Sequence, residues 1–234
     1  MKKLHMILEG TFYKKFPQTP SKIFDGFNMD RGSDPRAIGI RTFRNKTERS
    51  LWKSRAEIML SGMDMIVTDR LILRSPQESD LHNLYEHVLA DPDVMKMAFA
   101  GVPLSFEDAC AFFTTKLDHE QSGRKPGVLV ERRTQAVIGF AGLLPCDALN
   151  AVDYEFGFIL RRTAWGYGYA TEIGCGQIAY AFDTLKLSRV LALVAPENTA
   201  SAAVLKKLGL NFHSATQNKE RGERHVYSLT HEPP

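Results

Sequence analysis

Apolar positions follow two different periods along the chain from Met65 onward, and the two periods predict different elements. Alternating or continuous apolar runs are typical of strands. Such runs cover 66–74, 128–131, 137–144, 152–160, 190–194, 212 and 226–229. Apolar residues three and four apart are typical of one buried helix face. They recur over 79–91, 105–123, 169–182 and 198–208.

The order of these elements predicts a mixed sheet. The strand, glycine-containing loop, helix and strand between 152 and 194 require one parallel crossover, whereas the hairpins around them require antiparallel pairing. We therefore expect an α+β fold of mixed α/β character, formed by residues 63–231. It would consist of a mostly antiparallel sheet of about six to seven strands with helices on both faces.

Residues 1–62 lack this regularity. Prolines and glycines interrupt their short apolar clusters, and the segment holds 13 Lys and Arg against 6 Asp and Glu. In contrast, residues 63–234 hold 17 against 21. A basic, unpatterned segment is typical of a poorly ordered extension. Two alternatives stay open: a small packed domain, or a native product that begins at Met63 or Met65.

The composition argues against several classes of protein. The chain has no run of about 18 apolar residues, so we expect no membrane-spanning helix. The apolar run after Lys2 and Lys3 is too short for a secretory signal. The basic excess is confined to one end and lacks an interleaved aromatic or helical pattern, so we expect no nucleic-acid partner. The widely spaced Cys110, Cys146 and Cys175 indicate neither a metal site nor a disulfide framework, and they fit a cytoplasmic location.

The segment from Trp165 to Glu172 connects a predicted strand to a predicted helix. Its glycines, Gly166 and Gly168, allow the backbone to approach a ligand closely because they carry no Cβ atom. A helix that begins here presents N–H groups without intrahelical partners and a partial positive charge, which together attract phosphate. The alternative is a tight strand-to-helix turn that binds nothing.

Five segments match a known family in order and at similar spacing. They are Thr68–Arg74, Val137–Leu143, Trp165–Glu172, Glu197–Ser201 and Lys207–Leu210. In these segments the chain resembles the GCN5-related N-acetyltransferases (the GNAT superfamily), and most closely the branch that contains the ribosomal-protein N-terminal acetyltransferases. The resemblance covers most of the chain after residue 67.

Three positions depart from the family pattern. Trp165 stands where the wider family has Gln or Arg, so backbone N–H groups would hold the pyrophosphate without that cation. Leu205 stands near the place where many relatives have a tyrosine that acts as general acid. Leu210 replaces the phenylalanine that usually ends the last segment.

The resemblance implies acetyl-CoA as co-substrate, with no metal. It implies direct attack of a primary amine on the thioester, with no covalent enzyme intermediate. Asn198 would reach the pantetheine arm, and a backbone N–H between Phe158 and Leu160 would polarise the thioester carbonyl. The residues expected to bind the cofactor are Phe158, Ile159, Leu160, Trp165, Gly166, Tyr167, Gly168, Tyr169, Ala170, Thr171, Asn198 and Ser201.

Glu155 and Ser201 are the candidate catalytic residues. Glu155 lies among aromatic residues of the strand 152–160, and burial disfavours the charged form of a carboxylate, which suits a general base. The alternatives are that Glu155 faces solvent or pairs with an arginine. The resemblance places Ser201 near the sulfur, where its hydroxyl could donate to the leaving thiolate. The alternative is that Asn198 is only a helix N-cap and Ser201 only a first-turn residue.

Two functions from different classes stay open. The first is an N-acetyltransferase whose acceptor is a protein N-terminus or a small amine. The second is a non-catalytic domain of the same fold that binds or senses acyl-CoA. The acceptor pocket would be lined by the helices at 79–121 and by loops, where single residues carry little information about the acceptor. Nothing in the sequence distinguishes a monomer from a homodimer.

Overall fold

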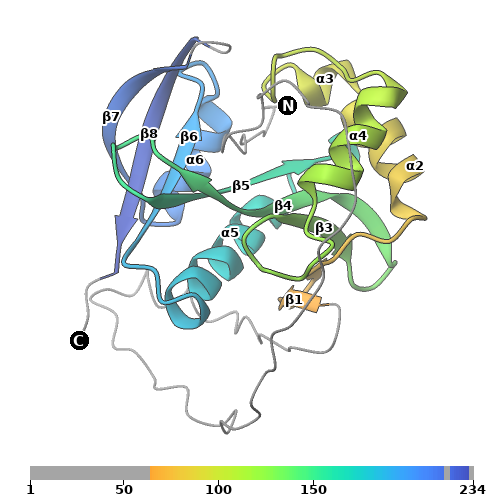
Figure 1. The fold of residues 1–234 in the computed structure, drawn as a ribbon, viewed down its shortest axis with the longest axis horizontal. Helices are drawn as coiled ribbons and strands as arrows, with labels where there is room; N and C mark the ends of the chain where they lie inside the picture. Colours follow the sequence, from red (N-terminus) through yellow and green to blue (C-terminus); the bar gives the residue numbers. More distant parts are fainter. Residues whose placement is uncertain (1–63, 219–221, 232–234) are drawn as a thin grey trace, which may run out of the picture.

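The computed structural model describes residues 64–218 and 222–231, so the expected extension at 1–62 lies outside it. The strands form one eight-stranded sheet in the order β1-β2-β3-β4-β5-β6-β8-β7 (Figure 1). The strands are β1 (Asp64–Val67), β2 (Leu71–Arg74), β3 (Pro126–Glu131), β4 (Ala136–Cys146), β5 (Asp153–Leu160), β6 (Arg189–Val194), β7 (Asn211–Asn218) and β8 (Gly222–Thr230). The α-helices are α2 (Asp80–Leu84), α3 (Pro92–Met95), α4 (Phe106–Lys116), α5 (Tyr169–Ala179) and α6 (Thr199–Lys207).

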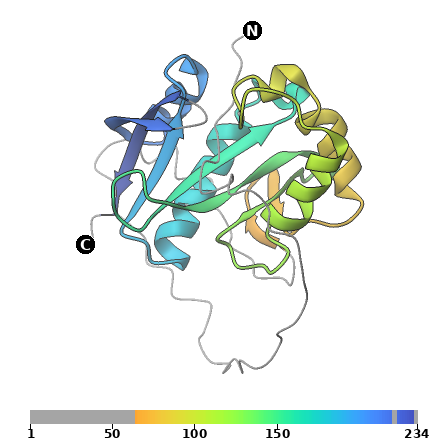
Figure 2. The ribbon, with the colours of Figure 1, turned by 45° about the horizontal axis from the view of Figure 1, so that its top comes forward.

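The two faces of the sheet carry separate hydrophobic clusters. On one face, α5 and α6 pack against the sheet in a cluster that includes Phe156 and Ile173. On the other face, α2, α3 and α4 pack in a cluster that includes Phe112 and Phe140 (Figure 2). This arrangement confirms the mixed, mostly antiparallel fold with helices on both faces. The sheet has eight strands instead of the expected six to seven.

The additional strand comes from 66–74, which we expected to form one strand. The segment forms the antiparallel hairpin of β1 and β2, because a turn at Thr68 interrupts the run. The Thr68 N–H donates to the Leu71 carbonyl (2.9 Å), and the Leu71 N–H donates to the Thr68 hydroxyl (3.0 Å). The prediction of a single strand was therefore wrong, since a threonine side chain closed the turn without a glycine or proline.

The helices on the second face are shorter than the apolar pattern predicted. The segment 79–91 is α-helical only to Leu84 and continues as a wider, π-helical turn. The next helix ends at Lys116 and does not reach Gly123. The Asp118 carboxylate accepts from the Gly123 N–H (2.7 Å), and this bond holds the intervening residues in a loop.

The strands β5 and β6 are parallel, with α5 as the crossover between them. β5 pairs with β4 along its whole length. Its pairing with β6 occurs at Glu155 and Leu191. Beyond this point the two strands diverge (Figure 1). The carboxyl half of β5 therefore has a strand neighbour along the β4 edge, while its other edge faces the space toward β6.

Candidate active site

The carboxyl ends of β5 and β6 lie at the same edge of the sheet because the two strands are parallel. β5 is followed by the glycine loop and α5, and β6 is followed by a short turn and α6. Both helices therefore begin at the edge where the strands diverge. In open sheets with parallel strands, ligands usually bind in a crevice outside these carboxyl ends.

The backbone of β5 presents polar groups toward the diverging strand. The Arg161 N–H donates to the Ile138 carbonyl of β4 (2.8 Å). Because hydrogen bonding alternates along an antiparallel strand, the Ile159 N–H also faces β4, whereas the N–H groups of Phe158 and Leu160 face the other edge. The N–H groups of Phe158 and Leu160 therefore point away from β4, toward β6. The Ile159 side chain is buried in the α2–α4 cluster.

The glycine loop leaves the start of α5 open. Gly166 and Gly168 have φ angles of +86° and +82°, a region that favours glycine. Gly168 is the N-cap of α5 and makes no side-chain cap. The first helical bond joins the Glu172 N–H to the Gly168 carbonyl (3.1 Å), so the three preceding N–H groups have no partner inside the helix. They belong to Tyr169, Ala170 and Thr171. This end of the helix fits a pyrophosphate.

Trp165 supports the loop from the protein side. Its indole Nε1–H donates to the Leu160 carbonyl (2.8 Å), and its backbone N–H donates to the Arg162 carbonyl (3.2 Å). The indole packs against the hydrophobic clusters on both faces of the sheet. Since both of its N–H groups are used within the protein, we assign Trp165 to supporting the loop instead of donating to the pyrophosphate.

A cation from a distant part of the chain lies against the loop. Arg70, in the turn between β1 and β2, donates from Nη1 to the Tyr167 carbonyl (3.0 Å). Its guanidinium carbon lies 4.7 Å from the centroid of the Tyr169 ring. Its Nε donates to Oε2 of Glu172 (2.6 Å). No pattern in the sequence predicts a role for Arg70, although the residue belongs to the first segment of the family resemblance.

Glu155 is completely buried on β5. The alternative in which it faces solvent is therefore wrong. Its neighbours across the strands are Leu144 on β4 and Leu191 on β6. Asp153, the first residue of β5, forms a two-point ion pair with Arg189, with N–O distances of 2.9 and 2.6 Å. Of the two carboxylates on this strand, Glu155 is the one at the point of divergence.

Cys146 is buried close to Glu155, and both its burial and this carboxylate affect its pKa. Burial raises the pKa of the Cys146 thiol, and the nearby Glu155 carboxylate raises it further. The thiol packs in a small cluster with Leu191, Leu193 and Val226. The thiol therefore stays protonated at neutral pH and serves as an apolar neighbour, since the thiolate is the reactive form of cysteine.

Asn198 and Ser201 lie at the start of α6. The Asn198 Oδ1 accepts from the Ser201 N–H (3.2 Å), which confirms the predicted N-cap. Both side chains are buried, with exposed fractions of 3% and 0%. Leu205 lies in the hydrophobic cluster under α6. A tyrosine acid of the kind used by many relatives therefore has no counterpart at that position.

A surface pocket of about 330 Å³ lies along a different face of α6 from Ser201. It is lined by Val194, Ala195, Pro196, Thr199, Ala202, Ala203, Lys206, His225 and Tyr227. No acid or amide side chain belongs to this lining. We therefore place the candidate chemistry at the diverging strands.

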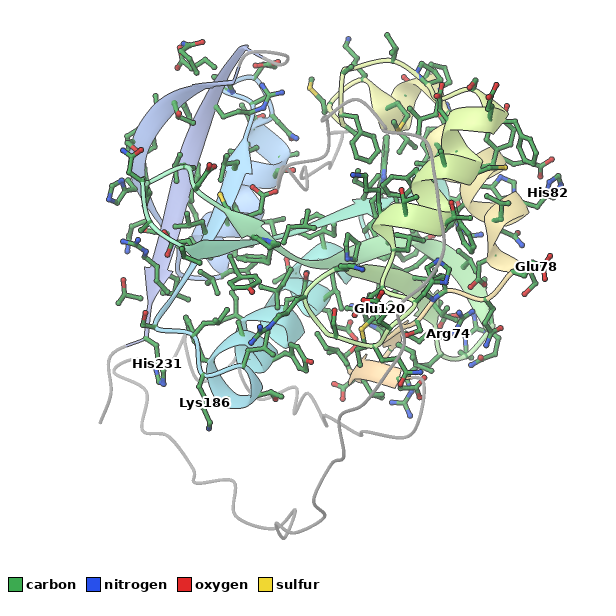
Figure 3. The ribbon with its side chains drawn as sticks, viewed as in Figure 1. Arg74, Glu78, His82, Glu120, Lys186 and His231 are labelled. Carbon is green, nitrogen blue, oxygen red and sulfur yellow. The ribbon has the colours of Figure 1, made fainter. Side chains whose placement is uncertain are left out.

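The described ranges, 64–218 and 222–231, contain no group of three or more His, Cys, Asp or Glu suited to a metal ion. Figure 3 shows His82 on α2 and His231 beyond β8 on opposite sides of the molecule. Among the helices of these same residues, none is long and apolar enough to cross a membrane.

Comparison with known proteins agrees with this geometry. Residues 70–211 match the family model described as an acetyltransferase (GNAT) domain. The uncharacterized N-acetyltransferase p20 of Bacillus licheniformis is 30% identical over 165 residues, which cover 69% of this chain and 90% of that protein.

Two solved structures from Vibrio cholerae share the fold. A putative ribosomal-protein-serine acetyltransferase superimposes with a TM-score of 0.57 at 22% identity, over 70% of this chain and 95% of its own. A spermidine N-acetyltransferase in complex with CoA and spermine superimposes with a TM-score of 0.57 at 17% identity, over 69% of this chain and 95% of its own.

The fold and the family match together define an acetyltransferase domain. The family match spans more than half of the chain. The protein belongs to the GNAT acetyltransferases.

Proposed function

We propose that this protein transfers the acetyl group of acetyl-CoA to a primary amine, either a protein N-terminus or a small molecule. One observation carries the proposal: three sets of groups meet at one edge of the sheet. They are the outward N–H groups of Phe158 and Leu160, the open start of α5, and Asn198 with Ser201 at the start of α6.

The donor would bind along this edge. The N–H groups at the start of α5 bind the pyrophosphate, where the helix dipole favours negative charge. The pantetheine arm follows β5 and bonds to its outward backbone groups, since that part of the strand lacks β6 as a ladder partner. Asn198 lies beside the arm, and the acetyl group comes next to Phe158.

The chemistry would be a direct acyl transfer. Glu155 accepts a proton from the acceptor ammonium, and the neutral amine nitrogen then attacks the thioester carbon. The Phe158 N–H stabilises the negative charge that develops on the carbonyl oxygen. The nitrogen–carbon bond forms and the carbon–sulfur bond breaks. Ser201 donates a hydrogen bond to the leaving thiolate. The thiolate becomes the thiol of CoA by taking up the proton that the acylated nitrogen loses as the amide forms, and the proton held by Glu155 is released to solvent.

The class of acceptor decides how much the base contributes. An α-amine has a pKa of about 8, so roughly a tenth of it is already neutral at pH 7. Alkyl amines near a pKa of about 10.4 need the base far more. The two Vibrio cholerae neighbours are named for a ribosomal-protein serine and for spermidine. Both acceptor classes therefore belong in the test.

The test is thiol release from acetyl-CoA over a panel of amines. The panel contains peptides with free and blocked N-termini, polyamines and amine-bearing antibiotics, and mass spectrometry identifies each acetylated product. Turnover with one class, and none with its blocked analogue, supports the proposal and names the acceptor. Tight binding of acetyl-CoA without turnover on any amine would instead support an acyl-CoA sensor.

A further inference from the structure

We propose that Arg70 is a positioning residue that holds the pyrophosphate loop in its binding shape and neutralises Glu172 beside it. The inference rests on the proposed binding of CoA at the start of α5, and it adds a residue that lies about a hundred positions before the loop. Trp165 brings no positive charge into the loop, and the cation that lies against the loop, Arg70, comes from the turn between β1 and β2.

The contacts of Arg70 bracket the loop on both sides of Gly168. Nη1 bonds to the Tyr167 carbonyl before it, and the guanidinium lies over the Tyr169 ring after it. Tyr169 in turn stacks on Tyr167, with ring centroids 5.9 Å apart. A Cβ atom on Gly168 would lie 3.6 Å from Nη2. The guanidinium therefore lies directly against the backbone that presents the N–H groups.

Glu172 is the anchor for this arrangement. Its carboxylate accepts from the Thr68 hydroxyl (2.6 Å), the Arg70 backbone N–H (2.8 Å) and the Arg70 Nε (2.6 Å). The Glu172 side chain is 9% exposed, whereas that of Arg70 is 46% exposed. The hairpin of β1 and β2 is thus fixed to the first turn of α5 by charge-assisted bonds.

The charges around Glu172 give Arg70 a second role, in addition to holding the β1–β2 hairpin against α5. A carboxylate in the first turn interacts favourably with the helix dipole, but it also repels a pyrophosphate at the same helix end. Pairing with the guanidinium cancels this repulsion and leaves the N–H groups and the dipole to attract the ligand. A purely structural tie would need only the Glu172 contacts, and would not need those to Tyr167 and Tyr169.

Two acyl donors separate positioning of the loop from general damage. Acetyl-CoA carries the pyrophosphate, whereas acetyl-pantetheine presents the same thioester without it. We expect Arg70→Ala to raise the KM for acetyl-CoA about 10- to 100-fold, the loss typical of a charged hydrogen bond. The kcat at saturation and the kcat/KM for acetyl-pantetheine should stay within about twofold. Equal losses with both donors would overturn the proposal, as would an unchanged KM for acetyl-CoA.

Arg132→Ala is the matched control. Arg132 donates from Nη1 to the carbonyls of Thr68 (2.7 Å) and Asp69 (3.2 Å), so it supports the same turn and makes no bond to the glycine loop. This variant should keep the wild-type KM for acetyl-CoA.

Arg70→Lys keeps the positive charge and still tests the proposal if the alanine variant does not fold. It should show a smaller rise in KM than Arg70→Ala.

The double variant Arg70→Ala/Glu172→Gln tests the neutralisation. Removing the carboxylate should restore part of the affinity for CoA that Arg70→Ala loses. If the double variant binds CoA as weakly as Arg70→Ala, Arg70 does not act by neutralising Glu172. Calorimetric titration of CoA into each variant requires no acceptor. Weaker CoA binding by Arg70→Ala would therefore support the role of Arg70 even if no amine were acetylated and the proposed reaction failed.

Discussion

Glu155 on β5 pairs with Leu191 on β6 at the point where the two parallel strands begin to diverge. The register thus puts a buried carboxylate at the paired position of the two strands. Ahead of it along β5 come the outward N–H groups of Phe158 and Leu160. A thioester that follows this edge would bring its carbonyl close to both a base and a hydrogen-bond donor.

Glu155→Gln should lower kcat/KM by about 10²- to 10⁴-fold, the usual contribution of a general base. The amide keeps the size of the side chain and removes its ability to accept the ammonium proton. The loss should shrink as pH rises toward the pKa of the acceptor, because more of the amine is then neutral. Steady-state rates from pH 6 to pH 9 measure this change. Asp147→Asn, in the exposed turn after β4, is the control and should leave the rate unchanged.

Ser201→Ala should lower kcat about tenfold and leave the KM for acetyl-CoA nearly unchanged, since the lost hydrogen bond forms mainly to the departing thiolate. The Asn198 cap uses the Ser201 backbone N–H, so the helix keeps its start. An acetyl donor with a more acidic thiol should reduce the difference between the variant and the wild type. A variant that keeps the wild-type kcat would exclude the hydroxyl from the reaction.

Gly168→Ala should lower the affinity for CoA together with the free energy of unfolding. The alanine must adopt a φ near +82°, at a cost of about 1–2 kcal/mol, or the loop must change shape. Gly209→Ala is the matched control, because Gly209 follows α6 with a φ of +86° and its Cβ would meet no atom within 4 Å. Both variants should have a lower melting temperature than the wild type, but only Gly168→Ala should bind CoA more weakly in calorimetric titrations.

Stability should fall in alkaline solution through Cys175. Burial raises the pKa of this thiol from 9.0 to about 11, and the Glu172 carboxylate adds to the shift. Above pH 9 the thiol ionises in the unfolded chain but stays protonated in the folded protein until about pH 11. The free energy of unfolding should therefore decrease between these values, by up to about 3 kcal/mol from this group. Urea unfolding at a series of pH values measures the slope.

Cys175→Ala should make that slope shallower, whatever its effect on stability at neutral pH. Cys110→Ala removes a partly exposed thiol and serves as the control, with the slope of the wild type. Identical slopes in all three proteins would contradict the assignment to Cys175.

Local patterns were enough to predict the parts of the site that depend on neighbouring residues. The glycines at 166 and 168 predicted an open helix start, and Asn198 predicted a cap that its Oδ1 indeed makes. The hairpin at Thr68 was missed because the turn depends on one threonine hydroxyl within a strand-like run. Contacts between residues that are far apart in the chain leave no local sequence pattern from which they could be predicted.

The Arg70–Glu172 pair shows why the rest could not be predicted. The two residues are separated by 102 positions, and each has an ordinary local explanation: a charged turn residue and a favourable first-turn acid. Their pairing follows from sheet order, which brings β1 and β2 against α5. The divergence of β5 from β6 is likewise a property of the packed sheet, so apolar periodicity along either strand does not encode it.

Trp165 has a consequence for how the enzyme can change. Its indole belongs to the packing on both faces of the sheet and also bonds to the end of β5. Any substitution that alters the volume of the α2–α4 cluster beneath it will shift the glycine loop as well. If these helices line the acceptor pocket, as the sequence predicts, substitutions that change acceptor preference would also change the affinity for acetyl-CoA.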